Sequence, residues 1–171
     1  MIILMAGLPG TGKTTLARQL AERVKGALLS KDAVRAALFA PEDITYSVEQ
    51  DDFVMELMLD AARFLLQKAP ARAIFLDGRP FSRSYQIDRV VRAAEELAQP
   101  WMIIECVCSE QSARRRLDLE PDPLHPARNR TFGLYLEVKA RFETIRYQKT
   151  RIDTDQTLER SIEQALAALS G

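Results

Sequence analysis

The sequence is poor in cysteine and histidine: its 171 residues include two cysteines and one histidine. Cys106 and Cys108 are separated by one residue in an apolar segment, so they are too close for an ordinary structural disulfide, and no further Cys or His cluster completes a metal site. These scarcities exclude a disulfide-stapled secreted scaffold and a zinc site. We expect both cysteines to be buried, reduced thiols of a cytoplasmic protein.

The sequence also lacks net charge and long hydrophobic runs. Lys and Arg together number 24, and Asp and Glu together number 24, so the composition gives no electrostatic argument for binding nucleic acid or a membrane surface. The apolar start at Met1–Ala6 is too short for the hydrophobic part of a signal peptide, and no segment is long enough to span a bilayer. We therefore expect no membrane partner, and a nucleic-acid partner is not favoured.

What the sequence does have is a glycine-rich motif near its start. Residues 7–14 are Gly7, Leu8, Pro9, Gly10, Thr11, Gly12, Lys13 and Thr14, which match G-x-x-x-x-G-K-[ST] at every required position. An apolar run precedes the motif and a segment with helical spacing follows it, so a strand, a loop and a helix N-terminus together form an anion site. The motif predicts that this loop and Thr15 bind ATP. Lys13 is expected to reach the β- and γ-phosphates, and the Thr14 hydroxyl to bind Mg²⁺.

Strand and helix patterns alternate along the chain. Strands are expected at 2–6, 27–30, 73–77, 101–108 and 151–154, and helices at 31–39, 48–68, 84–98, 110–117, 132–145 and 156–169 in addition to the one after the glycine-rich motif. This alternation indicates one α/β domain over residues 1–171, a parallel five-stranded sheet between two helical layers (α/β/α). We expect the strand order 2-3-1-4-5, because this order brings the end of the third strand close to Thr14.

A charged segment follows the second expected strand. Asp32 should lie on the same rim as Lys13, because the carboxyl ends of parallel strands form the ligand crevice of an open α/β sheet. A carboxylate at that point could accept the proton of an attacking hydroxyl. Arg35, one helical turn later, could hold an anionic or hydroxyl-rich acceptor. The alternative is that Asp32 only caps a helix and that Arg35 is solvated.

The third expected strand ends in an acid, Asp77. With a phosphate-binding loop present, a carboxylate at this point is typical of the residue that holds Mg²⁺ directly or through water. The alternative is a turn residue, since Asp77-Gly78 is a favourable turn pair.

Residues 118–131 contain three prolines and mixed charge, and helices are expected on both sides. We expect this segment to be a lid that closes on ATP and brings arginine toward the phosphates. The arginines in or beside it are Arg114, Arg115, Arg116, Arg128 and Arg130, and the alternative for each is a solvated surface residue.

Together, the glycine-rich motif, Asp32-x-x-Arg35, Asp77 and the arginine-bearing loop resemble the small P-loop kinases. The group in question comprises polynucleotide 5′-hydroxyl kinases, zeta toxins and chloramphenicol phosphotransferase, often described as AAA-family ATPases. The resemblance implies a P-loop NTPase fold with a lid, Asp32 as general base and Arg116 as the lid arginine that is followed by leucine. Related adenylate-type kinases have a second arginine four residues later, where this sequence has Glu120. Arg128 and Arg130 are the candidates to take its place as ATP-binding residues.

The resemblance implies an ATP-dependent kinase that phosphorylates a hydroxyl, and a small-molecule acceptor is favoured. Two alternatives stay open: a polynucleotide 5′-hydroxyl kinase, and an ATPase or nucleotide-dependent switch without an acceptor. A switch has no need of a base at Asp32. The acceptor is expected between Asp32, Arg35 and the 79–85 loop, with walls from Tyr46, Phe53, Phe81 or Tyr85.

Overall fold

The computed structural model describes residues 1–119, 127 and 129–170. Its centre is one sheet of five parallel strands, β1 (Ile2–Ala6), β2 (Ala27–Ser30), β3 (Ile74–Asp77), β4 (Trp101–Val107) and β5 (Thr150–Asp153). The strand order is β2-β3-β1-β4-β5, which confirms the order predicted from the sequence. The register pairs Ser30 with Asp77 across β2 and β3. The residues that follow Ser30 therefore begin beside the end of β3.

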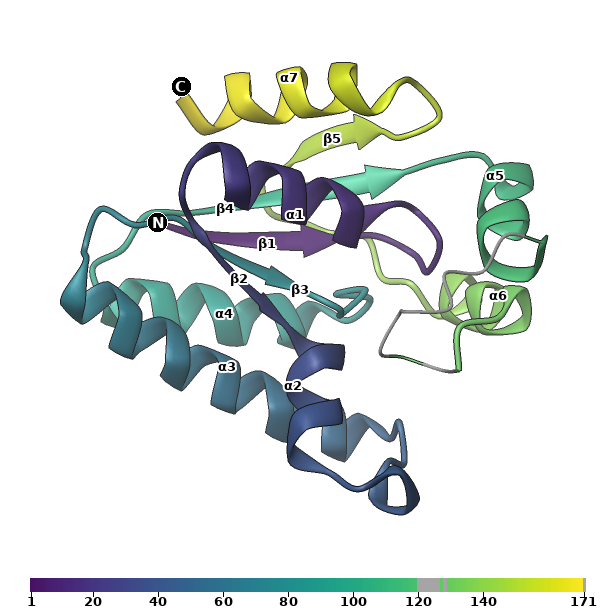
Figure 1. Cartoon of the computed structure of the whole chain (residues 1–171), viewed down its shortest axis with the longest axis horizontal. Helices are drawn as coiled ribbons and strands as arrows, with labels where there is room; N and C mark the ends of the chain where they lie inside the picture. The colour runs from purple at the N-terminus through teal and green to yellow at the C-terminus, as the bar shows by residue number, and fades with distance from the viewer. Residues whose placement is uncertain (120–126, 128, 171) are drawn as a thin grey trace.

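Helices cover both faces of the sheet (Figure 1). They are α1 (Lys13–Arg23), α2 (Lys31–Leu38), α3 (Val48–Lys68), α4 (Ser84–Glu96), α5 (Glu110–Arg114), α6 (Phe132–Ala140) and α7 (Leu158–Ser170), with a 3-10 turn η1 (Pro41–Asp43) and a π-helical turn η2 (Arg115–Leu119). Among the described residues, none of these helices combines the length and the apolar character that crossing a membrane requires.

Strand β1 shows why both faces must be covered. Successive side chains of a strand point to opposite faces. Ile2 and Leu4 accordingly lie in the core beneath α3 and α4, whereas Ile3 and Met5 lie in the core beneath α1 and α7. Each of these side chains is fully buried, and full burial of one such side chain stabilises the fold by about 1.5–3 kcal/mol.

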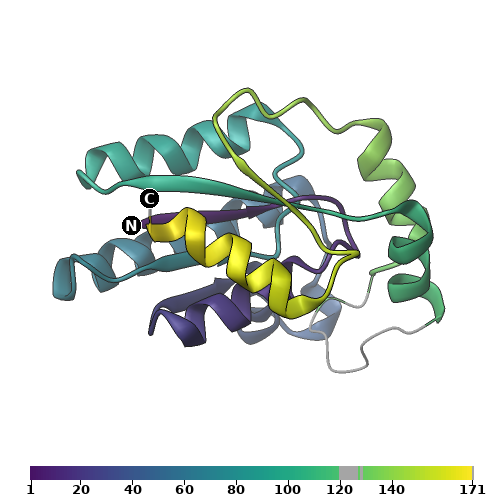
Figure 2. The same cartoon turned by 90° about the horizontal axis from the view of Figure 1, so that it is seen from above.

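The short helices α5 and α6 lie beyond the carboxyl ends of the strands (Figures 1 and 2). A separate small core of Ala113, Leu117, Phe132 and Tyr135 joins them. The backbone N–H of Phe132 donates to Oδ1 of Asp118 at 3.0 Å, so the two ends of the expected lid are held together. The expected irregular segment 118–131 begins later than predicted, because η2 extends through Leu119. Residues 120–126 and 128, which make up most of the lid, lie outside the described residues, and the lid stays a prediction.

Two further predictions need correction. The helix expected at 132–145 ends at Ala140, because residue 143 is tied to a different part of the molecule: the Glu143 backbone N–H donates to the Ser82 carbonyl at 2.9 Å. Both cysteines are free, but only Cys106 is buried and Cys108 is partly exposed. Burial raises the pKa of the Cys106 thiol to about 12, so this thiol is protonated at neutral pH.

Candidate active site

The glycine-rich loop joins β1 to α1 and has the backbone shape that the motif predicts. Gly7, Gly10 and Gly12 all have positive φ, between 77° and 132°. A Cβ on Gly7 would lie 2.2 Å from the Cys106 carbonyl oxygen, so a side chain at this position would push the loop away from β4. Helix α1 begins directly after the loop, and no side chain caps its N-terminus. The first-turn N–H groups therefore remain available to an anion.

Lys13 is folded back onto the loop. Its Nζ donates to the Leu8 carbonyl at 2.8 Å, and the Thr11 hydroxyl donates to the same oxygen at 2.8 Å. Burial lowers the pKa of Lys13, and the negative charge of Asp77 opposes that effect. The ammonium is thus in a desolvated position, where a nearby anionic group would stabilise its charged form.

Asp77 lies at the end of β3 and is 1 % exposed. Burial raises its pKa, while the charge of Lys13 lowers it. The Thr14 hydroxyl also approaches the carboxylate and lowers its pKa, but neither Asp77 oxygen accepts a hydrogen bond of ordinary geometry in the described part of the chain. A buried carboxylate without such partners is costly unless a cation compensates it.

Asp77 and Thr14 together fit the way in which proteins hold Mg²⁺ beside a nucleotide. Within the described residues, no three His, Cys, Asp or Glu side chains gather to form a cation site. Mg²⁺ needs no such cage, because it keeps several waters and is held by one or two carboxylates together with substrate phosphates. One carboxylate beside one threonine hydroxyl fits that coordination.

Asp32 belongs to a compact charged cluster at the N-terminus of α2. Gly78 lets this helix approach β3, since a Cβ there would lie 3.0 Å from the Lys31 Cβ. Arg35 Nη1 donates to Asp32 Oδ1 at 3.1 Å, and Lys31 Nζ lies 3.8 Å from the same oxygen. Both contacts are made to Oδ1, and no residue that the structure describes makes a hydrogen bond or an ion pair with Oδ2 of Asp32.

Sequence reasoning missed the acid that completes this cluster, Asp51 of α3. Lys31 Nζ donates to Asp51 Oδ1 at 2.8 Å, and Arg35 Nη2 donates to the same oxygen. The guanidinium of Arg35 is 2 % exposed and lies 5.0 Å from the centre of the Tyr46 ring. The only signal was an acidic pair in the first turn of a predicted helix, which does not reveal that α3 packs beside α2.

The buried ammonium of Lys31 leads to a testable expectation. Lys31→Met should raise the free energy of unfolding below pH 7, because it removes an ammonium whose charged form burial disfavours, and each unit by which its pKa is lowered corresponds to about 1.4 kcal/mol. Arg35 still pairs with Asp51 in this variant, so no buried charge loses its last partner. The charged groups that face Lys31 are Asp32, Asp51, Arg35, Arg79 and Asp77.

The pH dependence of this gain has a definite sign. Burial lowers the pKa of Lys31 from 10.5 to about 7. Between these values the unfolded chain binds one proton more than the folded protein, so stability of the wild type rises with pH. The gain from Lys31→Met should therefore be largest below pH 7 and shrink toward pH 10.5. Urea unfolding near pH 6 and near pH 9 measures it, with exposed Lys68→Met as control; an equal gain at both pH values would contradict the expectation.

A second residue missed from the sequence is Arg79, which follows Asp77 by two positions. It is 3 % exposed, and its Nη2 donates to Asp52 Oδ1 and to the Tyr85 hydroxyl, the latter at 3.3 Å. The side chain was overlooked because Gly78-Arg79-Pro80 looks like an ordinary turn. An arginine two residues after a strand-end acid, at the carboxyl edge of a parallel sheet, was the available signal.

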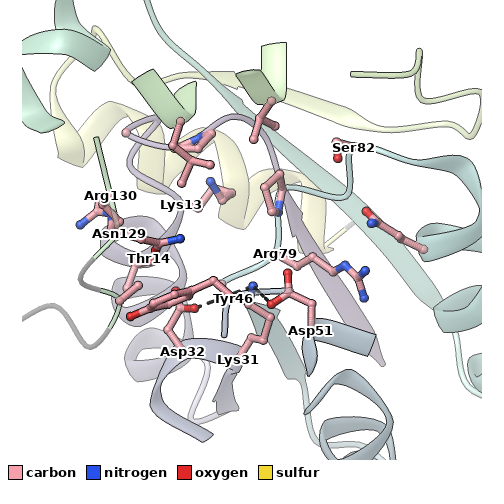
Figure 3. A pocket seen from close by; sticks show the side chains of 18 of the residues that line it. Lys13, Thr14, Lys31, Asp32, Tyr46, Asp51, Arg79, Ser82, Asn129 and Arg130 are labelled. Atoms are coloured by element: carbon pink, nitrogen blue, oxygen red, sulfur yellow. Dashed lines mark hydrogen bonds and ion pairs between the residues drawn. The ribbon is translucent and has the colours of Figure 1, made fainter. Parts of the chain in front are cut away.

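Most of these groups line one cleft of about 440 Å³ (Figure 3), whereas Asp77 and Asp52 are not among its lining residues. The predicted site residues that line it are Pro9, Gly10, Gly12, Lys13, Thr14, Thr15, Asp32, Arg35, Arg116 and Arg130. Figure 3 shows Lys13 and Thr14 on one side of the cavity and Asp32 on another, with Tyr46 beside Asp32. The structure thus brings the phosphate loop and the candidate base into one space.

Of the four aromatic residues expected to line the acceptor site, two do not line the cleft. Tyr46 and Tyr85 line the cleft. Phe53 instead lies on the surface against Phe39, with the ring centres 6.1 Å apart, and Phe81 is buried in the core beneath α3 and α4.

The candidate lid arginines do not all lie near the phosphate loop. Arg116 lies beside the phosphate loop, where Nη1 donates to the Gly10 carbonyl at 3.2 Å and Nη2 to the Thr154 carbonyl at 2.7 Å. Arg130 lines the cleft, and its charge lowers the pKa of Lys13. Arg114 is instead stacked 4.5 Å over the Phe132 ring, and Arg115 is not among the residues that line the cleft. Arg128 lies outside the described residues.

Comparisons with known proteins agree with this architecture. The model of the family described as AAA domain matches residues 2–120 of this chain. No protein among the curated sequences matches the chain significantly.

Several solved structures are similar over nearly the whole chain. Kti12 of Chaetomium thermophilum, crystallised with ADP-AlF3, is 16 % identical with a TM-score of 0.72, and the match covers 100 % of both chains. The APS kinase of Mycobacterium tuberculosis, in complex with AMPPNP and APS, is 14 % identical with a TM-score of 0.70, covering 99 % of this chain and 97 % of that one. A gluconokinase from Sinorhizobium meliloti is 18 % identical with a TM-score of 0.67, covering 99 % and 90 %. The family match and the shared fold lead to one conclusion: the chain belongs to the AAA domain family and has the fold of the small P-loop kinases.

Proposed function

We propose that this protein is an ATP-dependent kinase that transfers the γ-phosphate to a hydroxyl of a small molecule. The observation that carries the proposal is that Asp32, with an available Oδ2, lines the same cleft as Lys13 and Thr14. A nucleotide-dependent switch has no need of a carboxylate in that position. An APS kinase crystallised with an ATP analogue and a gluconokinase are similar to this chain in structure, which supports the same assignment.

The nucleotide half of the cleft is assigned to the glycine-rich loop. The loop N–H groups and the α1 N-terminus bind the phosphates, and Lys13 moves from the Leu8 carbonyl to the β- and γ-phosphates. Thr14 and Asp77 would hold Mg²⁺, which neutralises charge on the phosphate oxygens. Arg116 and Arg130 flank the phosphates, and Arg128 is proposed with them from its position in the sequence.

In the transfer step, the acceptor oxygen attacks the γ-phosphorus. The bond from that phosphorus to the β,γ-bridging oxygen breaks, ADP leaves, and the hydroxyl proton passes to Asp32 Oδ2. Arg35 acts as a positioning residue, because its hydrogen bond to Oδ1 holds the carboxylate in place. This geometry supplies orientation, which is the main protein contribution to phosphoryl transfer.

An ADP-release assay across sugars, nucleosides, antibiotics and 5′-hydroxyl oligonucleotides tests the proposal. Turnover is expected to depend on one class of small hydroxyl compound, with the Lys13→Ala protein as the blank. Turnover with oligonucleotides alone would make the protein a polynucleotide kinase. ATP hydrolysis that is indifferent to every acceptor would contradict kinase activity and favour a switch.

A further inference from the structure

Besides Arg18 of α1, three arginines line the cleft without belonging to the phosphate loop, the expected lid or the Asp32 cluster. Arg79 and Arg83 lie between β3 and α4, and Arg141 directly follows α6. The two segments are joined, because the Glu143 backbone N–H donates to the Ser82 carbonyl at 2.9 Å. Residues far apart in sequence therefore form one side of the cleft.

Acids that do not line the cleft hold two of these arginines. Asp52 accepts from Arg79 Nη2 through Oδ1, and Arg89 fixes the same carboxylate through Oδ2 at 3.3 Å. Asp52 itself is absent from the lining of the cleft. Asp52 thus orients the guanidinium of Arg79, a residue that lines the cleft.

Glu143 holds Arg83 in the same way. Its carboxylate accepts from Arg83 Nη1 at 3.0 Å and from the Ser84 backbone N–H at 2.7 Å. Hydrogen bonds from Ser84 and Arg83 hold the pKa of Glu143 at about 2, so it stays charged. Arg141, two residues earlier, makes no ion pair with any residue that the structure describes.

The lining of the cleft has a strong excess of positive charge. Its cationic residues, within the described part of the chain, are Lys13, Arg18, Lys31, Arg35, Arg79, Arg83, Arg116, Arg130 and Arg141, and its acids are Asp32 and Asp51. Both acids are used by Lys31 and Arg35. No lining acid is left for Arg79, Arg83 and Arg141, although the whole chain has no net charge. Arginine groups held in this way match the geometry of carboxylate and phosphate.

We propose that the acceptor carries a carboxylate or phosphate group, which Arg79, Arg83 and Arg141 bind while Asp32 faces its hydroxyl. This inference rests on the kinase function proposed above and names the class of its acceptor. Leu134 and Val138 of α6 add an apolar wall beside the arginines. The acceptor is therefore a small hydroxy acid or a phosphorylated alcohol rather than a neutral sugar or nucleoside.

The first experiment needs no knowledge of the acceptor. The protein is saturated with AMPPNP and Mg²⁺ to fill the phosphate loop, and sodium sulfate is then titrated while backbone amide NMR shifts are recorded. Saturable shifts are expected at residues 79–86 and 141–143. Absence of a saturable shift there overturns the inference.

Single variants test the three arginines. Arg83→Gln and Arg141→Gln should each weaken sulfate binding roughly tenfold, the loss of about one charge-assisted hydrogen bond. Arg79→Gln should do the same, and the two other variants carry the test if this buried position does not tolerate the change. Exposed Arg92 of α4 supplies the control Arg92→Gln, which should bind sulfate as the wild type does. Unchanged binding in all three site variants overturns the inference.

Matched acceptors separate this inference from the kinase proposal. ADP release is compared between gluconate and glucose, and between adenosine 5′-monophosphate and adenosine. Turnover with only the charged compound of a pair, together with lower turnover in Arg141→Gln, supports the inference. It also shows whether the site binds a carboxylate or a phosphate. Turnover with neutral members alone overturns it and leaves the kinase proposal standing. Failure to bind AMPPNP would contradict the kinase proposal. Sulfate binding at Arg79, Arg83 and Arg141 would still be expected in that case.

Discussion

In an Asp32→Asn variant, transfer to the acceptor is expected to fall about 10²–10⁴-fold, the usual share of general-base catalysis, while ATP affinity stays nearly unchanged. Asparagine keeps the size of the side chain and can still accept the hydrogen bond from Arg35 through its amide oxygen. The amide nitrogen then replaces Oδ2, the atom assigned to the acceptor proton. An amide cannot take that proton at neutral pH.

The measurement pairs transfer rate with nucleotide affinity in the same variant. Asp60→Asn, an exposed change of the same chemistry on α3, serves as the control and should leave both quantities unaltered. Slow ATP hydrolysis without acceptor should lose much less than transfer, because water is not the intended nucleophile. Full transfer activity in Asp32→Asn would remove the base assignment, and a loss of ATP affinity alone would favour a structural role.

Lys13→Ala is expected to lower ATP-dependent turnover by about 10²–10³-fold or more, the loss typical of one preorganised donor to developing charge. The fold should survive. Alanine is the best helix former for the first position of α1, and the change removes a buried ammonium whose pKa burial already lowers. The hydrogen bond lost is the one to the Leu8 carbonyl, an interaction worth about 1 kcal/mol.

Turnover, nucleotide binding by calorimetry and thermal unfolding are measured on the same preparation. Lys68→Ala at the exposed end of α3 is the matched control and should behave as the wild type. Wild-type turnover in folded Lys13→Ala protein would remove the phosphate loop from the mechanism. A collapse of the melting temperature would show instead that Lys13 supports the fold.

The sequence predicted the parts of the site that depend on local order. The glycine-rich loop and the acid at the end of β3 each follow from a few neighbouring residues, and the structure has both. The placement of β3 beside β1 could be predicted as well, because it brings Asp77 close to Thr14. These features required only local residue spacing and the rule that ligands bind at the carboxyl ends of parallel strands.

The remaining features depend on packing between distant segments. Asp51 joins the site because α3 lies beside α2, and hydrophobic periodicity does not specify which polar residue faces a neighbouring helix. Phe81 has a φ of 54° and lies in the core instead of lining the cleft. Such a backbone conformation is uncommon for a bulky residue and has no signature in sequence. The early end of α6 has the same origin, since Glu143 contacts a loop about 60 residues away in sequence.

Arg116 has a consequence for the thermodynamics of binding. Its guanidinium joins the Gly10 carbonyl of the phosphate loop to the Thr154 carbonyl after β5, and the Thr154 hydroxyl in turn donates to the Thr11 carbonyl. Two distant segments thus hold the loop before any nucleotide arrives. Ordering a loop costs conformational entropy of about 1–2 kcal/mol per residue. Because the loop is already ordered in the folded protein, nucleotide binding does not have to order it. More of the contact energy with the phosphates can therefore appear as affinity.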